Sequence, residues 1–344
     1  MKKFCAILIL ATIFASCNNN VDNDYFNGKI KTVKVNNTIK KEVTSQAIAL
    51  DGAFSGIIAV SDSLLICWTP YLADAHYSVF NVDTGKNLGS FCGKGHGSNE
   101  SVSLGCIFQL YKANDDLMAL LHAANEDKLF VWNITKSVCS GKTIYDKVLE
   151  CKNNRVFSLF RLSEDMMLLC KPSDDISRNK ITTPYCQMRT ISQNKLVKDY
   201  PIYINDEMEY TGETPDPFYS WNAIHPDGSK IVSVMKYLPQ INILDTKRGD
   251  ITGYRLDASY DFSYLLTSTK LSKVFYNHVH ADSDFIYATY WGKEQWNDSY
   301  GSKMPNFNKI HIYDWDGNLR YELTTDKSYL RIWSDSTRKR LYTV

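Results

Sequence analysis

The sequence has no long helical pattern, no membrane-spanning run and none of three short motifs that mark common sites. After residue 28, no long segment repeats its apolar residues at helical spacing between caps, which argues against a helical fold. The apolar run at residues 4–14 is too short to cross a bilayer, which requires about 20 apolar residues. The absence of G-x-S-x-G, G-x-x-x-x-G-K-[ST] and C-x-x-C excludes a hydrolase elbow, a phosphate-binding P-loop and a cysteine-pair zinc site.

Neither sign of charge is in excess. The full chain has 39 basic and 38 acidic side chains. Loss of residues 1–16 would remove two lysines and no acid, which leaves a net charge of −1. Surfaces that bind nucleic acid are clustered and basic, so a nucleic-acid partner is not expected.

The amino terminus has the pattern of an export signal followed by a tether. Two lysines precede the apolar run, and two small residues precede Cys17, as in a lipoprotein signal peptide. Residues 1–16 are therefore predicted to be cleaved and Cys17 to carry the lipid, although Phe14 stands where such signals usually have Leu. The alternative is an ordinary cleaved signal with Cys17 incidental. Residues 17–28 are polar and aperiodic, which predicts a flexible tether.

A lipid on Cys17 would anchor the chain to a bilayer without spanning it. We therefore expect a lipid-anchored location at the outer membrane or the periplasmic side of the cell envelope. The stretch NNNVDND that follows Cys17 is acidic but contains no unbroken acidic run, so both faces of the membrane stay open at this point.

The rest of the chain repeats one strand pattern. An apolar run, a polar turn and a second apolar run recur six times, at residues 54–68, 103–122, 156–170, 219–236, 274–291 and 329–344. After most copies a second hairpin follows, and its turn positions are spaced 50, 59, 53 and 69 residues apart. These positions are Asp83, Asn133, Ser192, Asp245 and Asp314. Each unit then has about four strands, the content of one propeller blade.

This repeat predicts an all-β fold, a six-bladed β-propeller that forms a single domain over residues 29–344. The sixth copy ends at Val344 after its first hairpin, whereas residues 29–35 alternate in the manner of a strand. We expect this N-terminal strand to close the last blade, because an open sheet edge is an aggregation liability. The alternatives are an incomplete chain and a stacked pair of smaller β domains.

Seven cysteines follow Cys17, and an odd number cannot all pair within the chain. Cys67, Cys106 and Cys170 lie in apolar runs, where a free thiol behaves as a small hydrophobic group. We expect mostly reduced, buried thiols. One disulfide among the other cysteines is the alternative.

Residues 91–100, FCGKGHGSNE, form a glycine-rich loop after the first predicted blade. The segment resembles the F-G-x-x-G-x-G-P-x-E signature of six-bladed, TolB-like propeller lipoproteins of Bacteroidetes, with Cys92 as an extra residue and Ser98 in place of Pro. Residues 312–318, IYDWDGN, resemble the last full-blade hairpin of that family. The resemblance implies this fold and a location in the cell envelope, and it implies no particular activity.

Glycines at alternate positions tolerate positive φ and let the backbone approach its neighbours closely. We interpret Gly93, Gly95 and Gly97 as part of a tight crossover between blades, in which Glu100 accepts hydrogen bonds from loop amides. A phosphate-binding loop is the alternative, and the spacing of the glycines does not fit it.

Residues 290–307 form an insertion that is longer than a hairpin requires and rich in aromatic side chains. Long loops in compact domains usually carry function, and flat rings bury much area at low entropic cost. We predict contact with an envelope protein or a glycan through five residues, Tyr290, Trp291, Trp296, Tyr300 and Phe307. The alternative is that these rings cover the core of their own blade.

The leading functional hypothesis is a non-enzymatic binding module, which requires no cofactor. The alternative is a hydrolase or lyase with a site in the central channel, where side chains at inner-strand ends would hold a calcium ion. The candidate ligands are Glu100, Asn125, Asp174, Asn222, Asp282 and Asp335. His278 and His280 would share one face of a strand, but a third metal ligand is not identifiable, and no catalytic residue is assigned.

Overall fold

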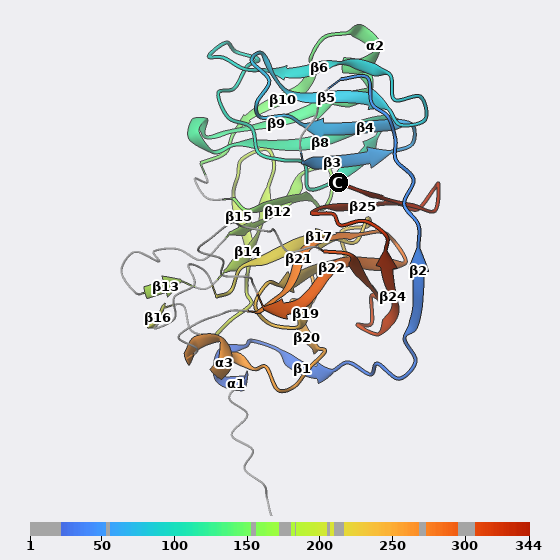
Figure 1. The fold of residues 1–344 in the computed structure, drawn as a ribbon. Coiled ribbons are helices and arrows are strands. Elements are labelled where there is room, and N and C mark those ends of the chain that lie inside the picture. The colour runs from blue at the N-terminus through green and yellow to red at the C-terminus, as the bar shows by residue number, and fades with distance from the viewer. Residues whose placement is uncertain are drawn as a thin grey trace, which may run out of the picture.

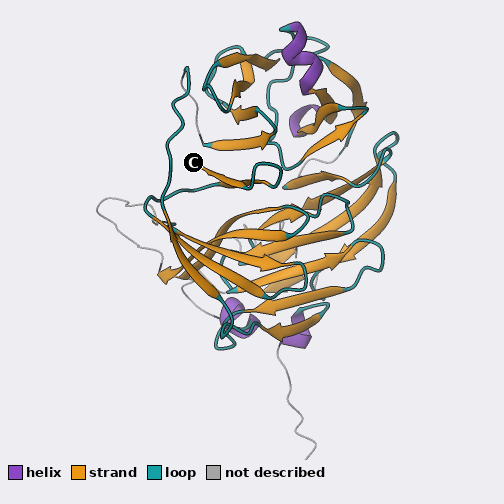
Figure 2. Ribbon diagram, turned by 90° about the vertical axis from the view of Figure 1, so that its right-hand side faces the viewer, coloured by secondary structure: helices purple, strands orange, loops and turns teal. Residues whose placement is uncertain are grey.

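The computed structural model describes most of the chain as β-structure. It describes residues 22–52, 56–152, 156–171, 180–182, 184–204, 207–209, 217–267, 273–294 and 307–344. These residues form 26 strands, with only short helices between them. None of the described helices is long and apolar enough to span a membrane. Figure 2 shows the helices at the periphery of the strands.

Five blades of four antiparallel strands each form most of the ring, and two of these sheets carry a fifth, N-terminal strand in parallel. Blade 1 consists of β3 (Ile57–Ser61), β4 (Leu64–Trp68), β5 (Ala75–Asn81) and β6 (Asn87–Gly93). Blade 2 consists of β7 (Leu110–Ala113), β8 (Asp116–Ala123), β9 (Lys128–Asn133) and β10 (Tyr145–Glu150). Blade 3 consists of β11 (Ser158–Arg161), β12 (Met166–Lys171), β14 (Tyr185–Thr190) and β15 (Leu196–Pro201).

The second half of the chain forms two further blades and a hairpin. Blade 4 consists of β17 (Ser220–Ile224), β18 (Lys230–Met235), β19 (Gln240–Asp245) and β20 (Ile251–Arg255). Blade 5 consists of β21 (Lys273–Ala281), β22 (Phe285–Glu294), β23 (Lys309–Asp314) and β24 (Leu319–Thr325). The sixth sheet is the two-stranded hairpin of β25 (Ile332–Asp335) and β26 (Arg340–Thr343).

Short elements fill the connections. The small pair β13 (Lys180–Thr182) and β16 (Glu207–Glu209) lies outside the blades. The helices are α1 (Asp22–Tyr25), η1 (Ala124–Glu126), α2 (Ile134–Ser140) and α3 (Phe262–Thr267). Two N-terminal strands, β1 (Lys29–Thr32) and β2 (Ile39–Val43), run along the outside of the ring (Figure 1).

The blades stack in sequence order and close into a ring, since the inner strand β25 contacts both β21 and β3. Buried side chains fill the spaces between neighbouring blades, and separate clusters join blades 1 and 2, 2 and 3, 3 and 4, and 4 and 5. A sheet cannot bury both faces alone, so each blade depends on its neighbours. The prediction of an all-β propeller is confirmed, with the sixth copy present as a single hairpin.

The N-terminal strand closes a different edge from the one expected. β1 pairs in parallel with β20, and β2 pairs in parallel with β24, so these strands cover the outer edges of blades 4 and 5. Closure of the last blade by residues 29–35 is therefore wrong. The reason is that Asp22 and Phe26 bind to blade 4 and place β1 beside β20.

Side-chain packing closes the ring instead. Trp333 and Tyr342 of the last hairpin insert into the core of blade 1, where both are buried. The guanidinium of Arg338 donates two hydrogen bonds to the Asp83 carboxylate in a blade 1 turn, at 2.6 and 2.9 Å. This fork geometry suits a guanidinium and a carboxylate and adds direction to the contact.

A buried ion pair holds the N-terminal segment on blade 4. Arg255 Nη1 donates to both Asp22 oxygens, at 2.9 and 2.7 Å, and Asp22 also accepts from the Phe262 amide. The Phe26 ring is buried and lies 5.9 Å from the Phe262 ring. The flexible tether predicted for residues 17–28 must be corrected, because the chain is folded from Asp22 onward.

The cysteines follow the expectation in part. Cys170 and Cys186 lie directly opposite each other on β12 and β14 and form a disulfide, so the expectation of a free Cys170 is wrong. Geometry explains this, because facing residues of adjacent strands bring their Cβ atoms within bonding reach. Three free thiols are buried, at Cys67, Cys92 and Cys151. Burial raises the pKa of Cys67 to about 12, which keeps that thiol protonated.

The ion pair between Asp22 and Arg255 gives a testable prediction. Asp22→Asn should lower the free energy of unfolding by about 3 kcal/mol, because it leaves the buried guanidinium without a counter-charge. The double variant Asp22→Leu with Arg255→Met should lose less, since no buried charge remains. Urea unfolding of both variants and of the exposed control Asp316→Asn measures these differences. Equal stability of Asp22→Asn and the control would contradict the assigned role.

Candidate functional site

The two faces of the ring carry different connections. In each blade the inner strand starts beside the end of the second strand, as Lys273 pairs with Glu294 and Ser220 with Met235. The connections between blades therefore share one face, which we call the loop face, with the segments that join second and third strands. The long connecting segments of this face are 94–109, 172–184, 202–219, 256–272 and 295–308. Short turns and α2 occupy the opposite face, the turn face.

Six side chains from blades 2 to 5 and the last hairpin meet on the inner strands or just before them, and we call them the channel-mouth cluster. They are Cys106, Phe157, Tyr219, Trp221, His278 and Arg331. The Phe157 ring lies 5.2 Å from both the Tyr219 and the Trp221 rings. Phe157, Trp221 and His278 come from the successive blades 3, 4 and 5, whereas Arg331 reaches Trp221 because the last hairpin closes the ring.

Arg331 extends from the last hairpin to blade 4. Its Cζ lies 4.1 Å from the centre of the Trp221 ring, a cation–π distance. No carboxylate of the described residues lies within 4 Å of this guanidinium. Burial lowers the pKa of Arg331, and the nearby guanidinium opposes the effect of burial on the thiol of Cys106, whose pKa is raised to about 11.

His278 and His280 bind the last hairpin and do not form a metal pair. Nδ1 of His278 accepts a hydrogen bond from the Ile332 amide, at 3.3 Å, and Nδ1 of His280 accepts one from the Ser334 amide, at 3.1 Å. Burial lowers the pKa of His278 well below its ordinary value and that of His280 to about 3, so both rings are neutral. The two imidazoles thus accept hydrogen bonds from amides on the inner edge of β25, the edge that does not pair with β26.

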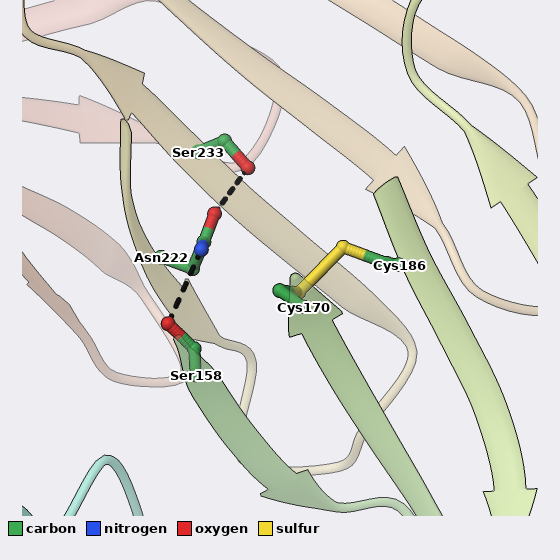
Figure 3. The surroundings of a disulfide bond; sticks show 5 residues. All are labelled: Ser158, Cys170, Cys186, Asn222 and Ser233. Atoms are coloured by element: carbon green, nitrogen blue, oxygen red, sulfur yellow. Dashed lines mark hydrogen bonds between the residues drawn. A yellow bond between two sulfur atoms is a disulfide. The ribbon is translucent and has the colours of Figure 1, made fainter. Parts of the chain in front are cut away.

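Two cavities lie beside the cluster. The first is partly open to solvent, has a volume of only about 20 Å³ and is lined partly by Phe157 and Tyr219 of the cluster. Its wall contains the disulfide of Cys170 and a hydrogen-bonded chain in which Asn222 donates to Ser158 at 3.2 Å (Figure 3). The second, between blades 2 and 3, is also partly open and has a volume of about 130 Å³. Its lining includes Cys106, Phe108 and His122.

The glycine-rich loop folds around the Glu100 carboxylate. The Gly97 amide donates to Glu100 Oε2 at 3.1 Å, and a Cβ placed on Gly95 would lie 2.0 Å from the same oxygen. Lys94 Nζ donates to the Pro70 carbonyl at 2.6 Å. The Ser101 hydroxyl donates to Glu126 of blade 2. These contacts tie the end of blade 1 to blade 2, and they occupy the polar groups of the loop.

The aromatic residues predicted to bind a partner lie in different environments. Tyr290 is half-buried and stacks on His311 with ring centres 3.9 Å apart. Trp291 is partly buried against the core shared by blades 3 and 4, and Phe307 is buried in that core, only 3% exposed. Trp296 and Tyr300 lie outside the described residues. Tyr290, Trp291 and Phe307 therefore pack on their own domain, while the prediction for the other two stays a prediction.

The carboxylates and amides suggested for a calcium site do not share one end of the channel. Glu100 lies on the loop face, whereas Asp282 and Asp335 follow inner strands at the turn face. Asn222 belongs to the wall of the first cavity, and Asp174 lies outside the described residues. Over the described ranges, no three His, Cys, Asp or Glu side chains are grouped as they would be around a metal ion.

The residues most prominent at the mouth, Arg331 and Trp221, were not predicted from the sequence. The sequence contained a signal for their shared location. Trp221 and Arg331 are each the third residue of a repeat copy, and the first residues of all copies must lie on the same face of a propeller. Their contact could not be predicted, since they are separated by a whole blade in sequence order and meet only across the channel.

The glycine-rich loop yields a prediction. Gly95→Ala should lower the free energy of unfolding by about 2 kcal/mol, because the added methyl group overlaps Glu100. Gly95→Ala should destabilise the protein less when Glu100→Ala is also present, because the truncated Glu100 side chain leaves room for the methyl group. Any strain that alanine causes in the backbone at position 95 is the same with Glu100 and with Ala at position 100. Urea unfolding of the four proteins of this double-mutant cycle measures the coupling. The same cost in both backgrounds would exclude the contact as the cause.

Comparison with known proteins agrees with the geometry. A member of the DUF4221 family from Bacteroides vulgatus is 14% identical, with 81% of this chain and 83% of that chain covered and a TM-score of 0.53. A Bacteroides fragilis protein whose name describes it as exported is also 14% identical, with 83% and 80% covered and a TM-score of 0.43. No curated protein matches the chain. At such identities the likeness concerns the fold alone.

The sequence model of one family spans nearly the whole propeller. It matches residues 38–337, which include every blade and the inner strand of the last hairpin. The family resemblance first seen in the glycine-rich loop is thus confirmed. This chain belongs to the TolB-like 6-blade propeller-like family.

Proposed function

We propose that the protein is a lipid-anchored binding module of the cell envelope that captures a protein or glycan partner on its loop face. One observation supports the proposal: side chains from four blades and the last hairpin converge at the channel mouth into an aromatic cluster that contains a partly buried arginine. Aromatic rings and arginine are the residues that contribute most to binding energy at interfaces. The two cavities beside the cluster add concave surface to the same face.

The chemistry of the mouth favours binding over catalysis. Cys106 is the only thiol in the cluster, and burial raises its pKa to about 11, so it is protonated and weakly nucleophilic at neutral pH. Nδ1 of His278 is already engaged by the Ile332 amide, which leaves the ring with a proton on Nε2 and no free base nitrogen. The hydrolase or lyase alternative therefore has no observation in its favour at this site.

The location in the proposal rests on the N-terminal sequence. The lysines and the apolar run at residues 2–14, followed by small residues and Cys17, support export and acylation. A binding module needs such an anchor to act at a membrane surface, and the described part of the chain starts at Asp22, five residues after Cys17.

Replacement of residues 295–306 by a short Gly-Ser linker should weaken capture of the partner by about tenfold or more. The reason is that this segment starts and ends on the loop face, while β22 and β23, the two blade 5 strands that it connects, keep their pairing. Immobilised mature protein is exposed separately to purified envelope glycans and to envelope proteins, and retained material is quantified. Thermal unfolding shows that the variant is folded.

The matched control is Lys247→Ala with Arg248→Ala, in an exposed turn of the turn face. Capture by this control should equal that of the original protein. Unchanged capture by the linker variant, or an equal loss in the control, would contradict a binding role for the loop face.

A further inference from the structure

We infer that the channel mouth and the adjoining first cavity bind an acidic sugar, a hexuronic acid unit whose carboxylate is received by Arg331. This inference rests on the proposed function, since it names the ligand class of the loop face. It depends on a buried hydrogen-bond donor without an acceptor, on the missing counter-charge of one arginine, and on the lining of the cavity.

Arg331 resembles Arg161, which lies over the Tyr111 ring, in being partly exposed and without a carboxylate partner in the described part of the chain, whereas two other arginines form ion pairs. Arg255 binds Asp22 and Arg338 binds Asp83, each through its guanidinium. Arg331 is only partly exposed, yet in the described part of the chain it contacts the Trp221 ring and no carboxylate. A partly buried guanidinium is costly without a counter-ion, and a planar carboxylate is the group that its fork binds best.

Two further donors lie on neighbouring blades. Trp221 Nε1 is buried and has no hydrogen-bond partner among the described residues. His278 accepts the Ile332 amide on Nδ1, so its proton is on Nε2. Blades 4 and 5 and the last hairpin thus each direct a donor group to the cluster, with no acid to receive it. A ligand rich in oxygen acceptors would satisfy these groups.

The first cavity is too small to enclose a sugar ring, but its wall offers groups on which one face of a ring can rest. It shares Phe157 and Tyr219 with the cluster and adds Tyr185, so aromatic surface is available for the apolar faces of a pyranose. Asn222 and Ser233 lie on the same wall and are hydrogen-bonded to each other, and Asn222 also donates to Ser158, so a sugar hydroxyl would share or replace these bonds (Figure 3).

Charge around the cavity is also of the required sign. Lys171 lines the first cavity, and the Lys236 ammonium lies 5.4 Å from the centre of the Tyr219 ring. No acidic side chain lines either cavity among the residues that the structure describes. A peptide with a free carboxyl terminus has the same charge, but the hydroxyl and amide groups of the wall match a polyhydroxylated ring better than a peptide side chain. We therefore assign the sugar and leave the peptide as an outcome of the test.

The test compares methyl β-glucuronide with methyl β-glucoside, which differ only in the carboxylate. Both are titrated into the mature protein, and binding is followed by tryptophan fluorescence and by calorimetry. The glucuronide should bind about tenfold tighter or more, and Arg331→Gln should reduce its affinity to that of the glucoside. Added salt should weaken binding of the glucuronide and leave the glucoside unchanged.

Two variants make the result interpretable. Arg331→Lys keeps the positive charge but lacks the planar guanidinium, so it should retain part of the preference for the glucuronide over the glucoside. It replaces Arg331→Gln in the test if that variant does not fold. Arg248→Gln, in an exposed turn-face position, should leave both affinities unchanged.

Three results would overturn the inference: equal affinity for the two glycosides, an unchanged preference in Arg331→Gln, or tighter binding of N-acetyl-alanyl-alanine than of the glucuronide. Each leaves the proposed function standing if the linker variant of residues 295–306 still loses its partner. If that variant keeps full capture, the proposed function fails instead.

Discussion

The contacts of Arg331 at the channel mouth depend on the apolar packing of the last hairpin against the first blade. Trp333 and Tyr342 are buried in the core of blade 1. In the described residues, no strand of the last hairpin pairs with a strand of blade 1. Arg331 immediately precedes β25, so the position of its guanidinium follows from this packing. His278 and His280 add direction, because their ring nitrogens hold alternate amides of the same strand. A ring closed by side chains thus sets the geometry of the mouth.

Much of the fold could be predicted from the sequence, because strand periodicity and turn residues are local signals. The six copies correspond to the six inner hairpins, and the shortened sixth copy is the hairpin of β25 and β26. The partner of the N-terminal strand was mispredicted since it depends on the contact of Asp22 with Arg255, which are 233 residues apart. The spacing of apolar residues along the sequence gives no information about that contact. The pairing of Cys170 with Cys186 was missed for a similar reason, because it depends on the register of two strands.

The candidate site was harder to predict than the fold. Glu100 was expected to accept hydrogen bonds from loop amides, and it accepts one from Gly97, because that contact spans three residues. The mouth, in contrast, combines side chains from different blades, and a partly buried arginine without a counter-charge is visible only in three dimensions. Aromatic content did not distinguish Phe307, which belongs to the core, from a residue of a binding surface. An aromatic side chain has the same sequence signature in a core and on a binding surface.

The docking of α1 on blade 4 also bears on how the domain would meet a membrane. α1 contacts α3, and α3 belongs to the connection from β20 to β21, which lies on the loop face. With the lipid that we propose on Cys17, five peptide units lead to Asp22, a reach of about 18 Å when fully extended. The rim of the loop face would then stay within that reach of the bilayer surface. Molecules confined to the same surface would meet the channel mouth at a high effective concentration, so even weak intrinsic affinity would suffice for capture.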